Sequence, residues 1–291
     1  MCGRFTLTTP TDEIAEYFRI LEGGMAAAGD RLAPRYNIAP TQAVACVRQV
    51  HPGHEERADP APDRPGSSVP RAASGRELVE MRWGLIPHWA KDPAIGNRMI
   101  NARAESVAEK PAYKAAFLQR RCLVVADGFY EWKRLPGGKQ PYFIHLKDRR
   151  PFAFAGLWER WRPREGQLDQ LVAPGKPRVP VTGAGRVESC AFLTVSPNDA
   201  LRDIHDRMPV ILPRRHWDTW VDVDVDDADE LRSLLLPYPA EEMAAYPVST
   251  HVNKPANDDP ACCEPLKKLK IVRPGAPDDP GPDPPEQESL F

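Results

Sequence analysis

The sequence has no long apolar run. No stretch approaches the roughly 18 residues that a helix needs to cross a bilayer, and the first residues, MCGRFTL, lack the apolar core of a secretory signal. These absences exclude membrane-spanning and secreted proteins, so we expect a soluble, cytoplasmic chain. In such a reducing compartment the six cysteines remain thiols instead of pairing in disulfides.

Metal-ligand patterns are missing as well. None of the cysteines forms a C-x-x-C pair, and no two histidines have the spacing that metal sites use. We therefore predict no metal site, and nothing in the sequence indicates an organic cofactor.

Proline, by contrast, is abundant and unevenly distributed. The 33 prolines concentrate in three segments, which are 51–70, 163–180 and 274–285. Segments of this composition bury too little apolar surface to fold. We therefore predict one domain over 2–273 with disordered inserts near 51–77 and 163–187, followed by a disordered acidic tail over 274–291.

The net charge of −2 conceals an uneven distribution of charge. The predicted tail carries five acids and no lysine or arginine, so the rest of the chain has a net charge of +3. A basic run from Arg98 to Arg134 provides a positive face, which permits an anionic partner but does not identify one.

Short strands dominate the predicted elements. Strand-like runs cover 2–7, 43–50, 78–84, 121–126, 128–134, 140–146, 151–157, 190–196 and 208–212. Helices are predicted over 10–21, with Thr9 as N-cap and a stop at Gly23–Gly24, and over 104–119, 198–203, 214–220 and 227–236. Frequent hairpin links and the lack of a βαβ rhythm predict an α+β fold, a single domain with an antiparallel, barrel-like β core and peripheral helices.

Cys2 offers chemistry that no internal cysteine has. A small residue at position 2 favours removal of Met1, which leaves an α-amine with a pKa of about 8 beside a thiol with a pKa of about 8.5. Such an amine attacks an aldehyde to form an imine, and the thiol then closes a five-membered thiazolidine ring. Closure is intramolecular and therefore fast. Taken alone, a cysteine at this position is also consistent with chance.

Four further segments accompany the N-terminal MCGRF. They read RYNIAP at 35–40, INARAE at 100–105, DGFYEWK at 127–133 and DIHDRMP at 203–209. Together, and in this order, they resemble the SOS-response-associated peptidase (SRAP) family, whose members crosslink to abasic sites in DNA. The resemblance extends from Cys2 to about residue 270, with gaps at the two proline-rich inserts.

The resemblance implies a catalytic set of Cys2, Asn101, Glu131 and His205. Asn101 holds the N-terminal amine, and Glu131 is the general acid/base, since a carboxylate among aromatics has a raised pKa. His205, oriented by Asp203 or Asp206, assists imine formation and reversal. Without the resemblance, these three side chains are equally well interpreted as a helix-capping Asn, an edge-strand Glu and a structural loop His.

The resemblance also implies a DNA-contacting set. Arginines near the catalytic residues are natural phosphate ligands, and exposed tryptophans stack on bases. For the tryptophans, core packing is the alternative interpretation. The predicted DNA-binding residues are Arg4, Asn37, Pro40, Trp83, Trp89, Arg103 and Arg207.

The tail contains one further motif. Residues 287–291 read QESLF, which resembles the Gln-x-x-Leu-Phe motif that binds the bacterial sliding clamp. Leu290 and Phe291 then fill an apolar pocket while Gln287 bonds to its rim. The sliding clamp is therefore a predicted partner, with chance recurrence of a short motif as the alternative.

Together these features predict a cytoplasmic, nucleoid-associated monomer that recognises abasic sites in single-stranded DNA and crosslinks to them through Cys2. The resemblance also implies autocatalytic processing of the N-terminus. Two other functions remain open: a cysteine peptidase that uses Cys2 as nucleophile, and a binding module that holds DNA without covalent chemistry.

Overall fold

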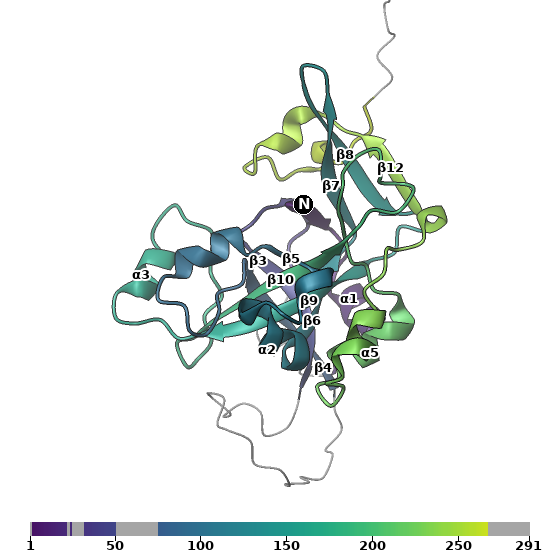
Figure 1. The fold of residues 1–291 in the computed structure, drawn as a ribbon. Helices are drawn as coiled ribbons and strands as arrows, with labels where there is room; N and C mark the ends of the chain where they lie inside the picture. Colours follow the sequence, from purple (N-terminus) through teal and green to yellow (C-terminus); the bar gives the residue numbers. More distant parts are fainter. Residues whose placement is uncertain (1, 22–23, 25–31, 51–74, 267–291) are drawn as a thin grey trace, which may run out of the picture.

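The computed structural model describes four ranges of the chain, 2–21, 24, 32–50 and 75–266. Figure 1 shows how its elements are arranged. The predicted insert near 51–77 lies outside the described residues except for 75–77, which begin a strand and so correct that boundary. The predicted tail over 274–291 lies wholly outside them.

A closed five-stranded barrel forms the centre of the molecule (Figure 1). Its strands follow the order β10-β4-β3-β6-β9, and β9 pairs back with β10 to close the ring. The bounds are β3 (Ala43–Val50), β4 (Gly75–Trp83), β6 (Arg121–Ala126), β9 (Phe152–Trp161) and β10 (Val187–Val195). The predicted α+β fold with a barrel-like β core is confirmed.

One strand of the barrel departs from the predicted antiparallel pattern. β10 runs parallel to β4 and also to the short strand β5 (Asn101–Arg103), while it is antiparallel to β9 and to β11 (Met208–Pro209). Parallel strands are joined by long connections, whereas hairpin signals predict antiparallel neighbours. The sequence pattern therefore did not predict the parallel pairing of β10. The pairing of β5 with β10 places Asn101 beside Phe192.

A second, fully antiparallel sheet has the order β12-β8-β7-β1-β2. Its strands are β1 (Arg4–Leu7), β2 (Arg35–Ile38), β7 (Gly128–Leu135), β8 (Gly138–Leu146) and β12 (Met243–Pro247). Gly137, at φ +91°, makes the predicted turn between β7 and β8, a conformation that glycine adopts without strain.

Aromatic packing joins β1 to the barrel. The ring of Phe5 meets Trp83, Phe154 and Phe192 edge-on, at centroid distances of 5.2, 5.8 and 6.4 Å. Such edge-to-face contacts add to the stability that burial alone provides. The N-terminal strand is therefore part of the core and not a loose end.

The helices are shorter than predicted. Helix α1 (Thr11–Phe18) has Pro10 rather than Thr9 at its N-cap, because the hydroxyls of Thr8 and Thr9 both bind the Asp127 carboxylate. It ends where Arg19 turns left-handed, at φ +54°, before the predicted glycine stop.

Pro111 divides the predicted helix 104–119. A short 3₁₀ turn (Ala104–Ser106) precedes α2 (Pro111–Gln119), because the residue before a proline disfavours helical backbone. The predicted helix near 198–203 forms only turns. The last two predicted helices are α4 (Trp217–Val221), after a 3₁₀ turn (Arg214–His216), and α5 (Ala228–Ser233). No helix in the described part of the chain is long and apolar enough to cross a bilayer.

The segment 163–187 has more structure than its composition predicts. It contains α3 (Gln167–Leu171), whose Leu168 and Leu171 pack on a small cluster with Trp161 and Val187. The Trp161 indole Nε1–H donates to the Ala90 carbonyl at 2.8 Å. Trp161, Ile86 and Ala90 thus provide apolar surface that adds to the segment's own Val179 and Val187.

Arg121 is a buried connector between β6 and the helical layer. Its side chain is 2% exposed, and burial lowers its pKa to about 10. The guanidinium donates to backbone carbonyl oxygens in α2, in α4 and in the residues that follow α4. These carbonyls belong to Phe117, Leu118, Trp220, Asp222 and Val225.

Replacing Arg121 by methionine is expected to destabilise the fold by roughly 3 kcal/mol, because the buried carbonyls lose their shared donor. Urea unfolding followed by circular dichroism measures the change. Arg202→Met, at an arginine whose side chain is 61% exposed, is the matched control and should change stability little. Equal urea midpoints of unfolding for the two variants would show that the Arg121 hydrogen bonds do not stabilise the fold.

Candidate active site

The candidate site is built around Cys2, two residues before the N-terminal strand. β1 pairs with β7 so that Arg4 lies opposite Tyr130 and Phe5 opposite Phe129. The register of these two strands fixes the position from which the chain runs back to Cys2. Cys2 is fully buried, and its thiol donates to the Arg4 carbonyl at 3.5 Å.

Asn101, on β5, holds the backbone of Cys2. Its amide Nδ2 donates to the Cys2 carbonyl oxygen at 2.7 Å. Its Oδ1 is buried and accepts no hydrogen bond within the described residues. The N-cap of the following 3₁₀ turn is Arg103, so the helix-capping interpretation of Asn101 is wrong. An oriented, buried acceptor therefore lies next to the start of the chain.

Glu131 is buried on β7, a strand flanked on both sides by β1 and β8. It does not lie on an edge strand, as the alternative interpretation required. Burial is the main reason that its pKa is raised to about 7, with the negative charge of Asp206 contributing in the same direction. At cellular pH the carboxyl group therefore exists in both protonation states, which a proton shuttle requires.

His205 lies in the turn before β11 and faces Glu131, with 3.8 Å between its Nε2 and Glu131 Oε2. Its Nδ1 lies 3.0 Å from the Arg207 backbone nitrogen and 3.2 Å from the Arg207 carbonyl oxygen, so this ring nitrogen can either accept or donate a hydrogen bond. Burial lowers the pKa of His205. When the ring is protonated, Asp206 Oδ1 lies 3.0 Å from Nδ1 and stabilises the cation, whereas Asp203 makes no such contact.

The thiol of Cys2 is neutral in this environment. Burial raises its pKa well above the ordinary value, and the nearby negative charge of Glu131 raises it further. The site therefore combines a protonated thiol, an oriented amide, a carboxyl group with a pKa of about 7 and a histidine that faces this carboxyl group. Their segments are far apart in sequence, and this set supports nucleophilic addition with local proton transfer.

Two of the predicted DNA contacts are structural. Asn37 is fully buried, and its Nδ2 donates to the carbonyl oxygens of Val252, Lys254 and Asn257. Arg4 donates to Asn37 Oδ1 at 2.7 Å and to the carbonyls of Val252 and Asn253. Both side chains thus bind the segment 248–263, which we call the clasp, and neither is a free phosphate ligand.

Trp83 is a core residue, which corrects the prediction that it stacks on a base. It is fully buried, it packs against Phe5 and Phe192, and its Nε1–H donates to the Ile100 carbonyl at 2.9 Å. Trp89, in contrast, is 52% exposed and borders a cavity of about 480 Å³ with Asn97 and Arg98.

The remaining predicted contacts differ in their surroundings. Arg103, two residues after Asn101, is exposed, and Pro40 is partly buried. Arg207 forms a two-pronged ion pair with the Glu105 carboxylate, at 2.7 and 2.9 Å, and also donates to the Thr194 carbonyl. Its charge is therefore partly compensated.

Sequence reasoning missed two groups. Tyr113, on α2, directs its hydroxyl to the Asn101 carbonyl at 3.4 Å. The clasp backbone, which binds Arg4 and Asn37, carries no motif that predicts such a role. The one group of described His, Cys, Asp and Glu side chains close enough to share a cation also lies there, and it comprises His251, Asp259 and Cys262. None of these three belongs to the catalytic set.

Comparison with known proteins gives consistent results. The abasic site processing protein YoqW of Bacillus subtilis (strain 168) is 40% identical over 265 residues, which cover 91% of this chain and 99% of that protein. The abasic site processing protein HMCES of Gallus gallus is 34% identical over 218 residues, which cover 67% of this chain and 59% of that protein.

The fold is also found among solved structures. A crystal structure of a protein from Bacteroides thetaiotaomicron superposes with a TM-score of 0.69 at 21% identity, covering 91% of this chain and all of the other. A sequence model described as SOS response associated peptidase (SRAP) matches residues 1–255. This match and the 40% identical relative establish that the chain belongs to the SRAP family.

Proposed function

We propose that this protein processes abasic sites, and that Cys2, exposed by removal of Met1, forms a thiazolidine with the open-ring sugar in single-stranded DNA. One observation carries the proposal. Asn101 Nδ2 binds the Cys2 carbonyl at 2.7 Å, while the Oδ1 of the same carboxamide is buried and has no hydrogen-bond partner among the described residues. An amine at the start of the mature chain provides the donor that this oxygen lacks.

The chemistry needs no cofactor. The lone pair of the Cys2 amine attacks the sugar aldehyde carbon to give a carbinolamine, which loses water to form an imine. The thiol sulfur then adds to the imine carbon, its proton passes to the nitrogen, and the five-membered ring closes. The balance is one aldehyde and one aminothiol giving one thiazolidine and one water, with no change of oxidation state.

Glu131 and His205 supply the proton transfers. The carboxylate of Glu131 takes a proton from the amine, and its acid form returns one to the departing hydroxyl. A pKa of about 7 makes both forms available. His205, whose Nε2 lies 3.8 Å from Glu131 Oε2, assists imine formation and its reversal. Because the Cys2 thiol is neutral, ring closure needs such a base nearby.

The named relatives and the surface support DNA carrying an abasic lesion as the substrate. Two relatives are named abasic site processing proteins. Cys2 is fully buried, so a sugar without its base is the nucleotide that reaches it most readily. Exposed Arg103 binds flanking phosphate, and exposed Trp89 stacks on an unpaired base. The crosslink then shields the lesion from strand scission and error-prone copying during replication.

Replacing Cys2 by serine is expected to abolish nearly all product that survives heating in detergent, because an oxygen ring analogue is less stable. The assay incubates the protein with an abasic oligonucleotide, and intact mass reports both Met1 removal and the adduct. Cys263→Ser is the matched control and should crosslink like the parent.

A non-covalent binding module gives no heat-stable band with either protein. A peptidase gives N-terminal processing without an adduct. Either outcome contradicts the proposed chemistry.

Replacing Glu131 by glutamine is expected to slow adduct formation by about 10²-fold. Because the carboxylate is the active base and its pKa is about 7, the rate advantage of the parent should grow from pH 6 to pH 8. In the variant, the rate should increase with pH only because the Cys2 amine loses its proton. Single-turnover rates across this range test the idea, with exposed Glu109→Gln as control. A parent-to-variant ratio that does not change with pH excludes Glu131 as the titrating base.

We further propose that residues 287–291, QESLF, bind the sliding clamp. Gln287, Leu290 and Phe291 lie outside the described residues, and the proposal rests on the motif alone. In a pull-down with purified clamp, the full-length protein should be retained and Leu290→Ala/Phe291→Ala should not. Equal retention of the two proteins removes the proposal.

A further inference from the structure

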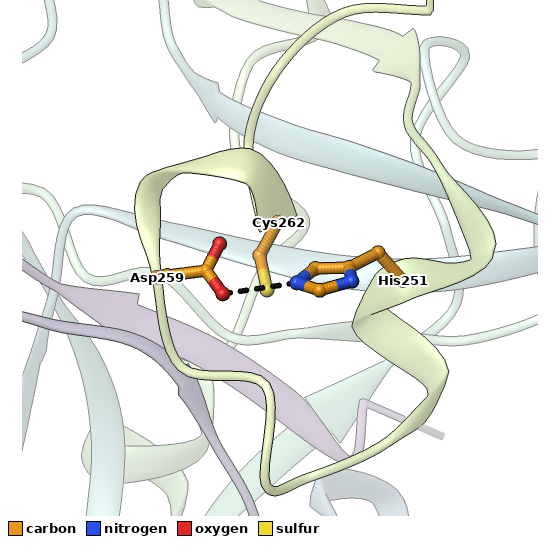
Figure 2. A group of neighbouring side chains, drawn as sticks. All are labelled: His251, Asp259 and Cys262. Atoms are coloured by element: carbon orange, nitrogen blue, oxygen red, sulfur yellow. Dashed lines mark hydrogen bonds and ion pairs between the residues drawn. The ribbon is translucent and has the colours of Figure 1, made fainter.

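The clasp, residues 248–263, brings together three side chains that the proposed reaction does not use. The first is His251, in a 3₁₀ turn (Thr250–Asn253). The other two are Asp259, the N-cap of a second 3₁₀ turn (Pro260–Cys262), and Cys262, the last residue of that turn. One ligand atom from each lies within 4.8 Å of the other two. Figure 2 shows the sulfur of Cys262 beside the contact between the imidazole and the carboxylate.

The distances are close to those of a tetrahedral metal site. His251 Nε2 lies 2.9 Å from Asp259 Oδ2. Zinc bonds of about 2.0–2.3 Å to nitrogen, oxygen and sulfur place ligand atoms roughly 3.2–3.8 Å apart. Side-chain adjustments of a few tenths of an ångström up to about 1 Å therefore convert the present arrangement into one face of a tetrahedron, without a change of the backbone.

We propose that His251, Asp259 and Cys262 bind a Zn²⁺ ion. The set of one imidazole, one thiolate and one carboxylate suits a borderline-soft cation, whereas Mg²⁺ and Ca²⁺ prefer oxygen ligands alone. Loss of the Cys262 proton gives the site two negative charges, which balance those of the ion. The His251 and Asp259 side chains are 37% and 48% exposed, so water completes the fourth position.

The groups around the three ligands also fit this role. Asn257 Nδ2 lies 3.1 Å from His251 Nδ1, on the side of the ring opposite to Asp259. Asn257 Nδ2 also donates to the His251 carbonyl at 2.7 Å, which fixes the 3₁₀ turn that carries the imidazole. The other carboxylate oxygen, Asp259 Oδ1, already accepts from the Ala261 backbone N–H at 3.0 Å. Such contacts orient metal ligands.

The position of this site connects it to the catalytic strand. The Asn257 carbonyl accepts hydrogen bonds both from Asn37 Nδ2, at 2.7 Å, and from the Cys262 thiol, at 3.2 Å. The same clasp accepts the guanidinium of Arg4, two residues after Cys2. A cation that joins the two turns of the clasp therefore stabilises the support of the N-terminal strand, and its role is structural.

Metal titration of the full-length protein tests the proposal. The Cys2 aminothiol is itself a chelator, so the experiment uses a Cys2→Ser background. Addition of Co²⁺ alone should give tetrahedral d–d bands and a thiolate-to-cobalt charge-transfer band that saturate at one equivalent. Zn²⁺ should displace the cobalt and raise the melting temperature by several degrees, because it binds only the folded clasp.

The matched variants identify the ligands. Cys262→Ser should lose the charge-transfer band, and His251→Ala should weaken cobalt binding at least tenfold. Cys263→Ser and His88→Ala should bind like the background protein, because the first alters the adjacent thiol and the second an unrelated half-exposed histidine. Circular dichroism checks that each variant folds.

Two results overturn the proposal. The first is the absence of a saturable cobalt spectrum in the folded background protein. The second is a spectrum that Cys262→Ser leaves unchanged. Neither result bears on crosslinking, which is measured separately on the protein with Cys2 intact.

Discussion

The hydrogen bond from Asn101 to the Cys2 carbonyl is the contact on which the site depends. It connects β5, a short strand on the barrel, to the segment that leads into β1 of the second sheet. Without it, the end of a chain is normally the least ordered part of a domain. The packing of Phe5 against Trp83 and Phe192 secures the same strand from the barrel side. Cys2 is thus held as firmly as a core residue, although it lies near the start of the chain.

Burial determines the chemistry of that terminus as well as its position. Removing Cys2 and Glu131 from water disfavours their charged forms, which raises the pKa of both. For the thiol this means low intrinsic reactivity until a base acts on it. For the carboxyl group it means a pKa near 7, where it can both donate and accept a proton. The same desolvation therefore keeps the Cys2 thiol neutral and brings the pKa of the Glu131 carboxyl group to about 7.

Two residues that the sequence predicts as DNA contacts, Arg4 and Asn37, instead bind the clasp. Arg4 and Asn37 belong to motifs that characterise the family, yet in the structure both are occupied by backbone carbonyls of residues 252–257. Their contribution to the site is support of β1. Arg207 is similar, because its pairing with Glu105 holds the turn that carries His205. Motif residues near an active site are thus divided between those that react and those that position.

The sequence determined the elements and the chemistry that are encoded locally. The predicted strands 43–50 and 121–126 have the observed bounds, because short runs rich in apolar and β-branched residues between turn signals indicate strands locally. Helix ends were less predictable, since Thr9 binds Asp127 rather than capping its helix. The proposed aminothiol of Cys2 rests on its position directly after Met1 and needs no fold.

Only the tertiary structure decided which distant residues meet. Trp83 looked suited to stacking on DNA, but pairing of β4 with β10 places it in the core. His251, Asp259 and Cys262 match no metal spacing, and two successive turns bring them together. The raised pKa of Glu131 likewise arises from strands on both sides of β7. Burial and contact are properties of the packed chain, because each depends on neighbours that the local sequence does not contain.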